Sequence, residues 1–187
     1  MMSPIPLPVQ LARTTLRDLT IDDLEVYVDM HARVDVARYL YWEPRSMEES
    51  RAALERKIAN AATADATSVN LAVTRNADGE FVGELNLHVF DAANRGAEIG
   101  FIFHPDHHGQ GYAGESAAAL LAMAFDTFGM HRVIGRCDAR NTSSALLMKR
   151  LGMRVEAHFR SNEFVKGEWC DERVFAMLED EHRSMDR

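Results

Sequence analysis

The sequence predicts one mixed α/β domain in which strands and helices are interleaved. Two β-rich segments, residues 69–74 and 81–89, are joined by Asn76-Ala-Asp-Gly79, which is typical of a hairpin. An apolar strand at residues 98–103 leads through a glycine-containing loop into an alanine-rich helix at residues 114–128. That helix is apolar on nearly every side, as expected of a helix that lies against a sheet.

The remaining elements follow from the usual start and stop signals of helices and strands. Residues 14–19 alternate as a strand, and residues 20–23 offer a cap and an acidic first turn to a helix that runs to about Val34. Ser46-Met-Glu-Glu49 is a capping box, which begins a helix that ends near Ala62. The C-terminal part contains a strand at residues 132–138, a helix at residues 142–151 ended by Gly152, and a hairpin of residues 155–165 and 172–178 around Lys166-Gly167.

The composition is that of a soluble globular protein. The chain has 187 residues, of which 47% are hydrophobic and 27% charged, and this size fits one domain. No apolar run approaches the ~20 residues that cross a bilayer, and the first eight residues do not have the features of a secretory signal. Cys137 and Cys170 form no Cys-x-x-Cys pair, which favours a reduced, cytoplasmic protein. We expect a domain at residues 13–180, a flexible proline-containing arm at residues 1–12 and a tail at residues 181–187.

The formal net charge of -8 disfavours two kinds of partner. An acidic chain is not expected to bind nucleic acid or an anionic membrane surface, and its charge favours cationic substrates. Any anion must therefore be held locally, by backbone amides rather than by a basic surface.

The loop Gly109-Gln-Gly-Tyr-Ala113 has the pattern of an anion site. Between a strand and a helix, successive backbone N–H groups can converge on one point, where the helix N-terminus adds partial positive charge. A P-loop is excluded because Tyr112 stands where a lysine is required, and the spacing of a dinucleotide-binding fingerprint is absent. From the glycines alone, a tight turn without a ligand is an equally good interpretation.

Several segments together resemble the GNAT N-acetyltransferase superfamily and, within it, the RimJ/RimL branch of ribosomal-protein N-terminal acetyltransferases. They are Ala97-Glu-Ile-Gly100, His104-Pro-Asp-His-His-Gly-Gln-Gly-Tyr-Ala113, Asn141-Thr-Ser-Ser144, Lys149-Arg-Leu-Gly-Met153, Phe159-Arg160 and Phe164-Val-Lys-Gly-Glu-Trp169. The likeness spans residues 14–178. It implies a mixed, mostly antiparallel sheet of about seven strands flanked by about four helices. It also implies that the strand at residues 98–103 splays from the strand at residues 132–138 at the acyl-CoA site.

The resemblance implies that acetyl-CoA is the acetyl donor. The phosphate motif of the family, Gln/Arg-x-x-Gly-x-Gly/Ala, maps onto His108, Gly111 and Ala113, and His108 departs from it. Charge-assisted bonds from the amides would hold the diphosphate without that side chain. Lys149 would reach the adenosine phosphates, or would stabilise the end of its helix. The implied acetyl-CoA-binding residues are Phe101, Phe103, His108, Gly109, Gln110, Gly111, Tyr112, Ala113, Gly114, Asn141, Ser144 and Lys149.

The resemblance further implies direct attack of an amine on the thioester in a ternary complex. Glu163 matches a carboxylate near the acceptor, and Glu98 is a second candidate for the base. Each has a structural alternative: Glu163 as a solvated strand residue, and Glu98 as a buried acid satisfied by backbone or an arginine. Ser144 would donate a hydrogen bond to the departing thiolate, cap its helix, or do both. A backbone amide within residues 101–103 would stabilise the oxyanion.

A protein α-amine is the expected acceptor. Roughly a tenth of α-amines but under about a thousandth of lysines are neutral at pH 7. The residues expected to line the acceptor site are Tyr41, Trp42, Glu163 and Phe164. Two alternatives stay open: acetylation of a small cationic amine of the polyamine or aminoglycoside type, and a catalytically weak acyl-CoA sensor.

A zinc site at His104, His107 and His108 is disfavoured, because no carboxylate or cysteine pattern accompanies these histidines. We therefore expect no metal. Homodimers are common in the branch that the chain resembles, so a homodimer is a further expectation.

Overall fold

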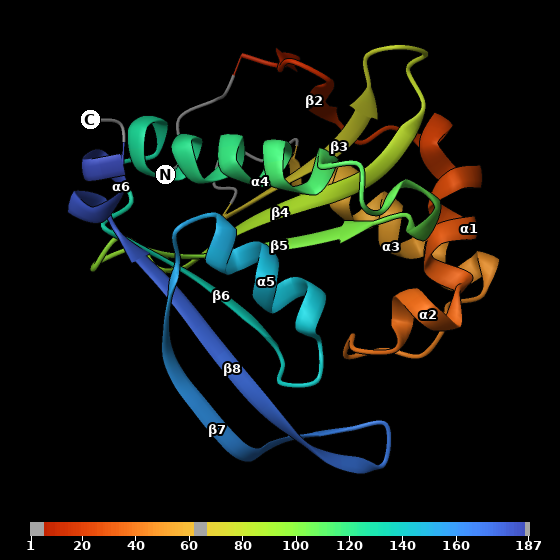
Figure 1. Ribbon diagram of the computed structural model, residues 1–187. Helices are drawn as coiled ribbons and strands as arrows, with labels where there is room; N and C mark the ends of the chain where they lie inside the picture. Colours follow the sequence, from red (N-terminus) through yellow and green to blue (C-terminus); the bar gives the residue numbers. More distant parts are fainter. Residues whose placement is uncertain (1–5, 62–66, 186–187) are drawn as a thin grey trace.

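In the computed structural model, which describes residues 6–61 and 67–185, one sheet organises the domain (Figure 1). The sheet has eight strands in the order β1-β2-β3-β4-β5-β6-β8-β7. All neighbouring strands are antiparallel except β5 and β6, which are parallel. The strands are β1 (Val9–Gln10), β2 (Thr14–Asp18), β3 (Ser68–Arg75), β4 (Phe81–Asp91), β5 (Gly96–Phe103), β6 (Arg132–Asp138), β7 (Arg154–Val165) and β8 (Glu168–Leu178).

Six α-helices flank the sheet in the described part of the chain. They are α1 (Leu24–Ala32), α2 (Val34–Ala37), α3 (Met47–Ala61), α4 (Tyr112–Ala122), α5 (Thr142–Arg150) and α6 (Glu179–Met185). A π-helical turn, Met123–Thr127, extends α4. No helix among the described residues is long and apolar enough to cross a membrane.

The mixed, mostly antiparallel sheet is confirmed, with differences at the short elements. The extra strand, β1, has only two residues and follows several prolines, so no periodicity could indicate it. It lies in the expected arm, residues 1–12, and pairs with β2. The expected helix to Val34 is two helices, because Arg33 is extended at φ -77° and ψ 132°. The capping box at α3 is present, since Ser46 N donates to Glu49 Oε2 at 2.8 Å and Glu49 N to Ser46 Oγ at 3.2 Å. The expected end of α3, Ala62, lies outside the described residues.

The parallel pair β5–β6 separates along its length, as the resemblance implied. The two strands pair only at Gly96–Arg132, Ala97–Val133 and Glu98–Ile134. Beyond these pairs β5 continues to Phe103 and β6 to Asp138. The strands therefore diverge, and their facing backbone groups have no partner in this ladder.

The alternation of β5 divides the core into two layers. Ile99 and Phe103 belong to a cluster that includes Ala117 and Leu120 of α4. Ile102 packs instead against a second cluster, formed mainly by α1 and α3. Because successive strand residues face opposite sides, Glu98 lies on the same face as Ile102. In Figure 1, α4 and α5 lie in front of the sheet, and α1 and α3 lie toward its other side.

The β7–β8 hairpin is long and projects from the body of the domain (Figure 1). Lys166 and Gly167 form its turn with φ angles of 51° and 83°, as a two-residue hairpin turn requires. Lys166 Nζ donates to Ala37 O at 2.6 Å. This bond ties the hairpin tip to α2, so that β7, β8 and the segment after α2 meet on one side of the sheet.

Candidate active site

A cavity of about 1000 Å³ lies between the diverging end of β5, the glycine loop, α4 and α5. It extends from the loop to the segment after α2. The sequence-predicted residues among those lining it are Phe101, Phe103, His108, Gly109, Gly111, Tyr112, Ala113, Gly114, Asn141 and Ser144. The structure therefore brings together ten of the twelve residues expected to bind acetyl-CoA.

Gln110 and Lys149 are the two expected residues that do not line this cavity. Gln110 Nε2 donates to Asp106 O at 3.4 Å, within the loop itself. Lys149 is exposed on α5, and its neighbour Arg150 lines the cavity instead. A cation is present near the end of α5, one position later than expected.

The glycine loop reaches α4 through two left-handed residues. Gly109 has φ +74° and Gly111 has φ +83°, and α4 begins at Tyr112. A Cβ added at Gly109 would meet no atom within 4 Å, so the backbone there is open. The first N–H groups of an α-helix have no partner within the helix and carry partial positive charge. The loop and the first turn of α4 thus present backbone donors beside the cavity.

His108 braces the loop against β5. Its Nε2 donates to Phe103 O at 3.0 Å, because a carbonyl oxygen can only accept. This bond explains how the loop keeps its position although the family motif has Gln or Arg here. The two other histidines have separate partners: His104 Nε2 lies 2.8 Å from Asp29 Oδ2, and His107 Nε2 lies 3.4 Å from Glu80 Oε1.

Asn141 caps α5. Its Oδ1 accepts a hydrogen bond from Ser144 N at 3.1 Å, so Asn141 performs the capping that the sequence offered as one role of Ser144. Ser144 is the third residue of α5 and lines the cavity beside Ser143.

A cluster of three carboxylates surrounds Arg136 on the opposite face of the diverging strands. Arg136 Nε donates to Glu98 Oε1 at 3.0 Å, and its Nη1 lies 3.3 Å from Glu172 Oε1 and 3.6 Å from Glu163 Oε1. Glu98 comes from β5, Arg136 from β6, Glu163 from β7 and Glu172 from β8. The structure thus joins both candidate bases through one guanidinium.

Tyr41 reaches the same cluster. Its hydroxyl donates to Glu172 Oε1 at 3.5 Å, and Asn162 Nδ2 donates to Glu172 Oε2 at 2.9 Å. Burial raises the pKa of Glu172; Arg136 opposes this change, and the charges of Glu163 and Glu98 reinforce it. Burial and the charge of Glu163 raise the pKa of Tyr41 as well, so its phenol stays protonated.

Trp42 and Phe164, the other two residues expected at the acceptor site, lie apart from the cluster. Arg45 covers the indole of Trp42 at 4.2 Å, and His31 lies 6.2 Å from it, so Trp42 faces the α1 side of the core. Phe164 is 62% exposed and contacts Trp169 edge-on at 5.4 Å near the hairpin tip.

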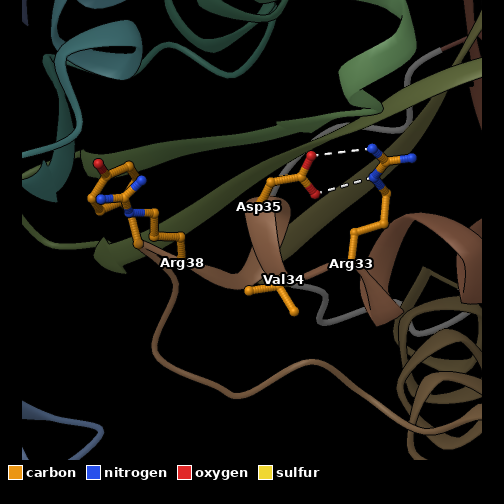
Figure 2. A pocket seen from close by; sticks show the side chains of 5 residues that line it. Arg33, Val34, Asp35 and Arg38 are labelled. Carbon is orange, nitrogen blue, oxygen red and sulfur yellow. Dashed lines mark hydrogen bonds and ion pairs between the residues drawn. The ribbon is translucent and has the colours of Figure 1, made fainter.

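A second, shallower hollow of about 620 Å³ lies over α2. Figure 2 shows Arg33 and Asp35 in a two-bonded ion pair there, with Arg38 on the other side of the short helix. Asp35 and Tyr39 line both this hollow and the larger cavity. The two hollows are therefore neighbours around α2.

Sequence reasoning missed Arg136, Glu172 and Arg150. The first two stand on strands whose neighbours are known only once β6 and β8 are placed in register. Nothing in the local pattern distinguishes them from other charged strand residues. Arg150 directly follows the predicted residue, Lys149, and the rotation of α5 about its axis decides which of the two lines the cavity.

The family is shown by sequence. The model of the acetyltransferase (GNAT) domain matches residues 13–154, and the chain belongs to this family of acetyltransferases. The protein is therefore an acyl-CoA N-acyltransferase. Over 84 residues the chain is 40% identical to the uncharacterized N-acetyltransferase YnaD of Bacillus subtilis (strain 168), covering 45% of this chain and 49% of that protein. The match thus spans about half the length of that relative.

Two solved structures resemble the whole domain. A GNAT-family acetyltransferase from Bacillus anthracis aligns with a TM-score of 0.84 at 28% identity, covering 93% of this chain and 99% of that one. The spermidine N-acetyltransferase of Vibrio cholerae, in complex with CoA and spermine, aligns with a TM-score of 0.79 at 21% identity, covering 92% and 99%. The second likeness shows the fold alone.

Proposed function

We propose that the protein transfers the acetyl group of acetyl-CoA to the α-amine of a protein N-terminus. The observation that carries the proposal is the continuous cavity from the glycine loop to the diverging end of β5, with the carboxylate cluster on the other face of the same strands. An acetyl thioester reaching the gap between β5 and β6 would be open to an amine arriving from the cluster side.

The cavity fits the donor by its chemistry. The N–H groups of the loop and of the first turn of α4 would hold the diphosphate, and Arg150 would lie near the phosphates of the adenosine end. Beyond its last pair with β6, the edge of β5 that faces the gap would hydrogen-bond the pantetheine chain, and a backbone amide within residues 101–103 would supply the oxyanion donor. Bound acetyl-CoA supplies an electrophilic thioester carbon and a thiolate leaving group.

Two side chains would act on the reacting groups in this scheme, and a third would position Arg136. Glu163 is the proposed base, because its 3.6 Å contact with Arg136 is the longest of the three carboxylates and leaves it freest to accept a proton, directly or through one water. Glu98 is held at 3.0 Å by Arg136 and would position that guanidinium. Ser144 would donate a hydrogen bond to the thiolate, since it lines the cavity while Asn141 performs the capping.

The hairpin tip favours a polypeptide acceptor. Phe164 and Trp169 are 62% and 63% exposed at the tip of the hairpin that carries Glu163, and such an aromatic surface suits the side chains of a peptide. An α-amine also needs less help from a base, because a sizeable fraction is neutral at pH 7.

A small polycation is the second candidate acceptor, and the charge of the cluster favours it. Three carboxylates share the one guanidinium of Arg136, so acidic groups outnumber basic ones in the cluster and favour a cationic substrate. The Vibrio cholerae enzyme of the same fold, which acts on spermidine, was crystallised with spermine.

Thiol release from acetyl-CoA, measured over peptides with free N-termini, the same peptides with blocked N-termini, spermidine and an aminoglycoside, tests the proposal. We expect turnover with free peptides and none with blocked ones. A higher kcat/KM for spermidine than for the free peptides would show that the acceptor is a small polycation and not a protein N-terminus. Tight CoA binding without turnover on any of these amines would contradict the proposed activity and indicate an acyl-CoA sensor.

A further inference from the structure

Arg13, which precedes β2, holds the glycine loop from the side away from the cavity. Its Nη1 donates to Gln110 O at 2.8 Å and its Nη2 to Gly111 O at 3.3 Å. Its Nε donates to Glu115 Oε2 at 2.9 Å, and its backbone N donates to Glu115 Oε1 at 2.8 Å. Arg13 does not line the cavity, whereas Gly111 does. One side chain therefore joins two loop carbonyls to the first turn of α4.

Peptide geometry turns these contacts into an effect on the amides. In a planar trans peptide, the C=O of one residue and the N–H of the next point in opposite directions. Holding Gln110 O toward Arg13 thus directs the N–H of Gly111 away from it. Holding Gly111 O does the same for the N–H of Tyr112. Both amides belong to residues that line the cavity.

Gly111 is fitted to this arrangement on two counts. Its φ of +83° is one that other residues rarely adopt, and a Cβ there would lie 2.9 Å from Arg13 Nη2. The guanidinium also lies 5.6 Å from the centre of the Tyr112 ring, so it packs along the turn that it holds. The missing side chain at position 111 therefore makes room for the guanidinium of Arg13.

We infer that Arg13 is a positioning residue for the diphosphate of the acyl donor: by binding the carbonyls of Gln110 and Gly111, it orients the amides of Gly111 and Tyr112 toward the cavity. This inference rests on the proposed function, in which that loop binds the diphosphate of acetyl-CoA. Arg13 itself acts through the backbone and does not touch the donor.

The test compares two acetyl donors, acetyl-CoA and S-acetylpantetheine, which carries the same thioester but no diphosphate. We expect Arg13→Met to lower kcat/KM for acetyl-CoA about ten-fold, through KM, and to change kcat/KM for S-acetylpantetheine less than about two-fold. Arg13→Lys should recover part of the loss, because an ammonium can bind one carbonyl but does not reproduce the guanidinium fork. Arg17→Met is the matched control, since Arg17 lies four residues further along the chain, on β2, and pairs with Asp23 instead; it should leave the ratio between the two donors unchanged.

Two results would overturn the inference. Equal losses with both donors in Arg13→Met would make Arg13 a residue of general stability. An unchanged kcat/KM for both donors in that variant would show that the loop keeps its amides oriented without Arg13. A wild-type enzyme with equal kcat/KM for both donors would instead refute the diphosphate site, and the proposed function would fail before the variants were compared.

Discussion

Arg136 of β6 donates a 3.0 Å hydrogen bond to Glu98 of β5 at the last position where these two strands are paired. The ion pair therefore bridges the strands at the point where they begin to separate. Glu163, on β7, contacts the same guanidinium more weakly at 3.6 Å. The two carboxylates thus occupy different positions relative to one cation, and their substitution should have different consequences.

Glu98→Gln is expected to act mainly on stability, and Glu163→Gln mainly on catalysis. Losing the ionised partner of Arg136 should lower the free energy of unfolding by about 1 kcal/mol in Glu98→Gln, since the pair is partly exposed. Glu163→Gln should lower kcat/KM about 100-fold at pH 7 if Glu163 is the base. Denaturant unfolding and pH–rate profiles with a free peptide measure the two effects. Glu168→Gln, an exposed control in the same hairpin, should change neither by much, and a larger catalytic loss in Glu98→Gln would reverse the assignment.

The two loop glycines should respond differently to alanine. Both have a positive φ. A Cβ added at Gly109 would meet no atom within 4 Å, whereas a Cβ added at Gly111 would lie 2.9 Å from Arg13 Nη2. We expect KM for acetyl-CoA to rise about 3-fold in Gly109→Ala and more than about 10-fold in Gly111→Ala. Gly129→Ala is the control and should leave KM unchanged, because Gly129 also has a positive φ of +63°, a Cβ there would meet no atom within 4 Å, and it lies beyond the opposite end of α4. Equal KM values in the three variants would contradict the loop assignment.

The elements that could be predicted are those with local signals. The hairpin at Asn76–Gly79, the capping box at Ser46 and the strand–loop–helix around Gly111 each have their causes within a few residues of sequence. The extended Arg33 had no such signal: it separates α1 from α2 while its side chain pairs with Asp35. Helix propensity alone therefore predicted one continuous helix, whereas the extended backbone of Arg33 divides it into two.

The parts of the candidate site that lie in contiguous segments could be predicted, and the parts that different strands bring together could not. Its cofactor side lies on the loop and the following helices, where motifs are contiguous. Its acceptor side depends on the register between β6 and β8, which sets Arg136 opposite Val174 and places Glu172 within reach of the guanidinium. Arg13 is 97 residues from Gln110, and a bond over that separation leaves no trace in local sequence.

Ser144→Ala should lower turnover with little effect on donor binding. The hydroxyl is proposed to donate one hydrogen bond to the thiolate, and a net hydrogen bond of about 0.5–1.5 kcal/mol corresponds to a fall in kcat of about 2- to 13-fold. KM for acetyl-CoA should stay within about 2-fold. Asn141→Ala is the contrast, because it removes the cap of α5 and should lower the free energy of unfolding by about 1 kcal/mol. A fall in stability of the same size in Ser144→Ala would assign the serine to the helix rather than to the leaving group.

A buried ion pair links α3 to the sheet and should make stability depend on pH in the acid range. The carboxylate of Glu84 on β4 is bonded to Lys57 Nζ and lies 3.2 Å from His31 Nε2, with only 3% of the Glu84 side chain exposed. Burial alone would raise the pKa of Glu84, but the charge of Lys57 and the hydrogen bond from His31 outweigh it and lower the pKa to about 2 from an ordinary 4.5.

Because the folded protein binds the proton of Glu84 more weakly than the unfolded chain does, the pair stabilises the fold fully above pH 4.5. This contribution is lost as the pH falls from 4.5 toward 2. Glu84→Gln should cost roughly 2–4 kcal/mol at pH 7, since it leaves Lys57 without its partner although 26% of that side chain reaches solvent. The difference in unfolding free energy between wild type and Glu84→Gln, measured by urea denaturation, should then shrink as the pH is lowered. Glu55→Gln on α3, whose partner Arg51 is 3.9 Å away and exposed, should cost less than about 0.5 kcal/mol at either pH. A Glu84→Gln difference that stays constant from neutral pH to pH 3 would mean that the carboxylate keeps an ordinary pKa in the fold.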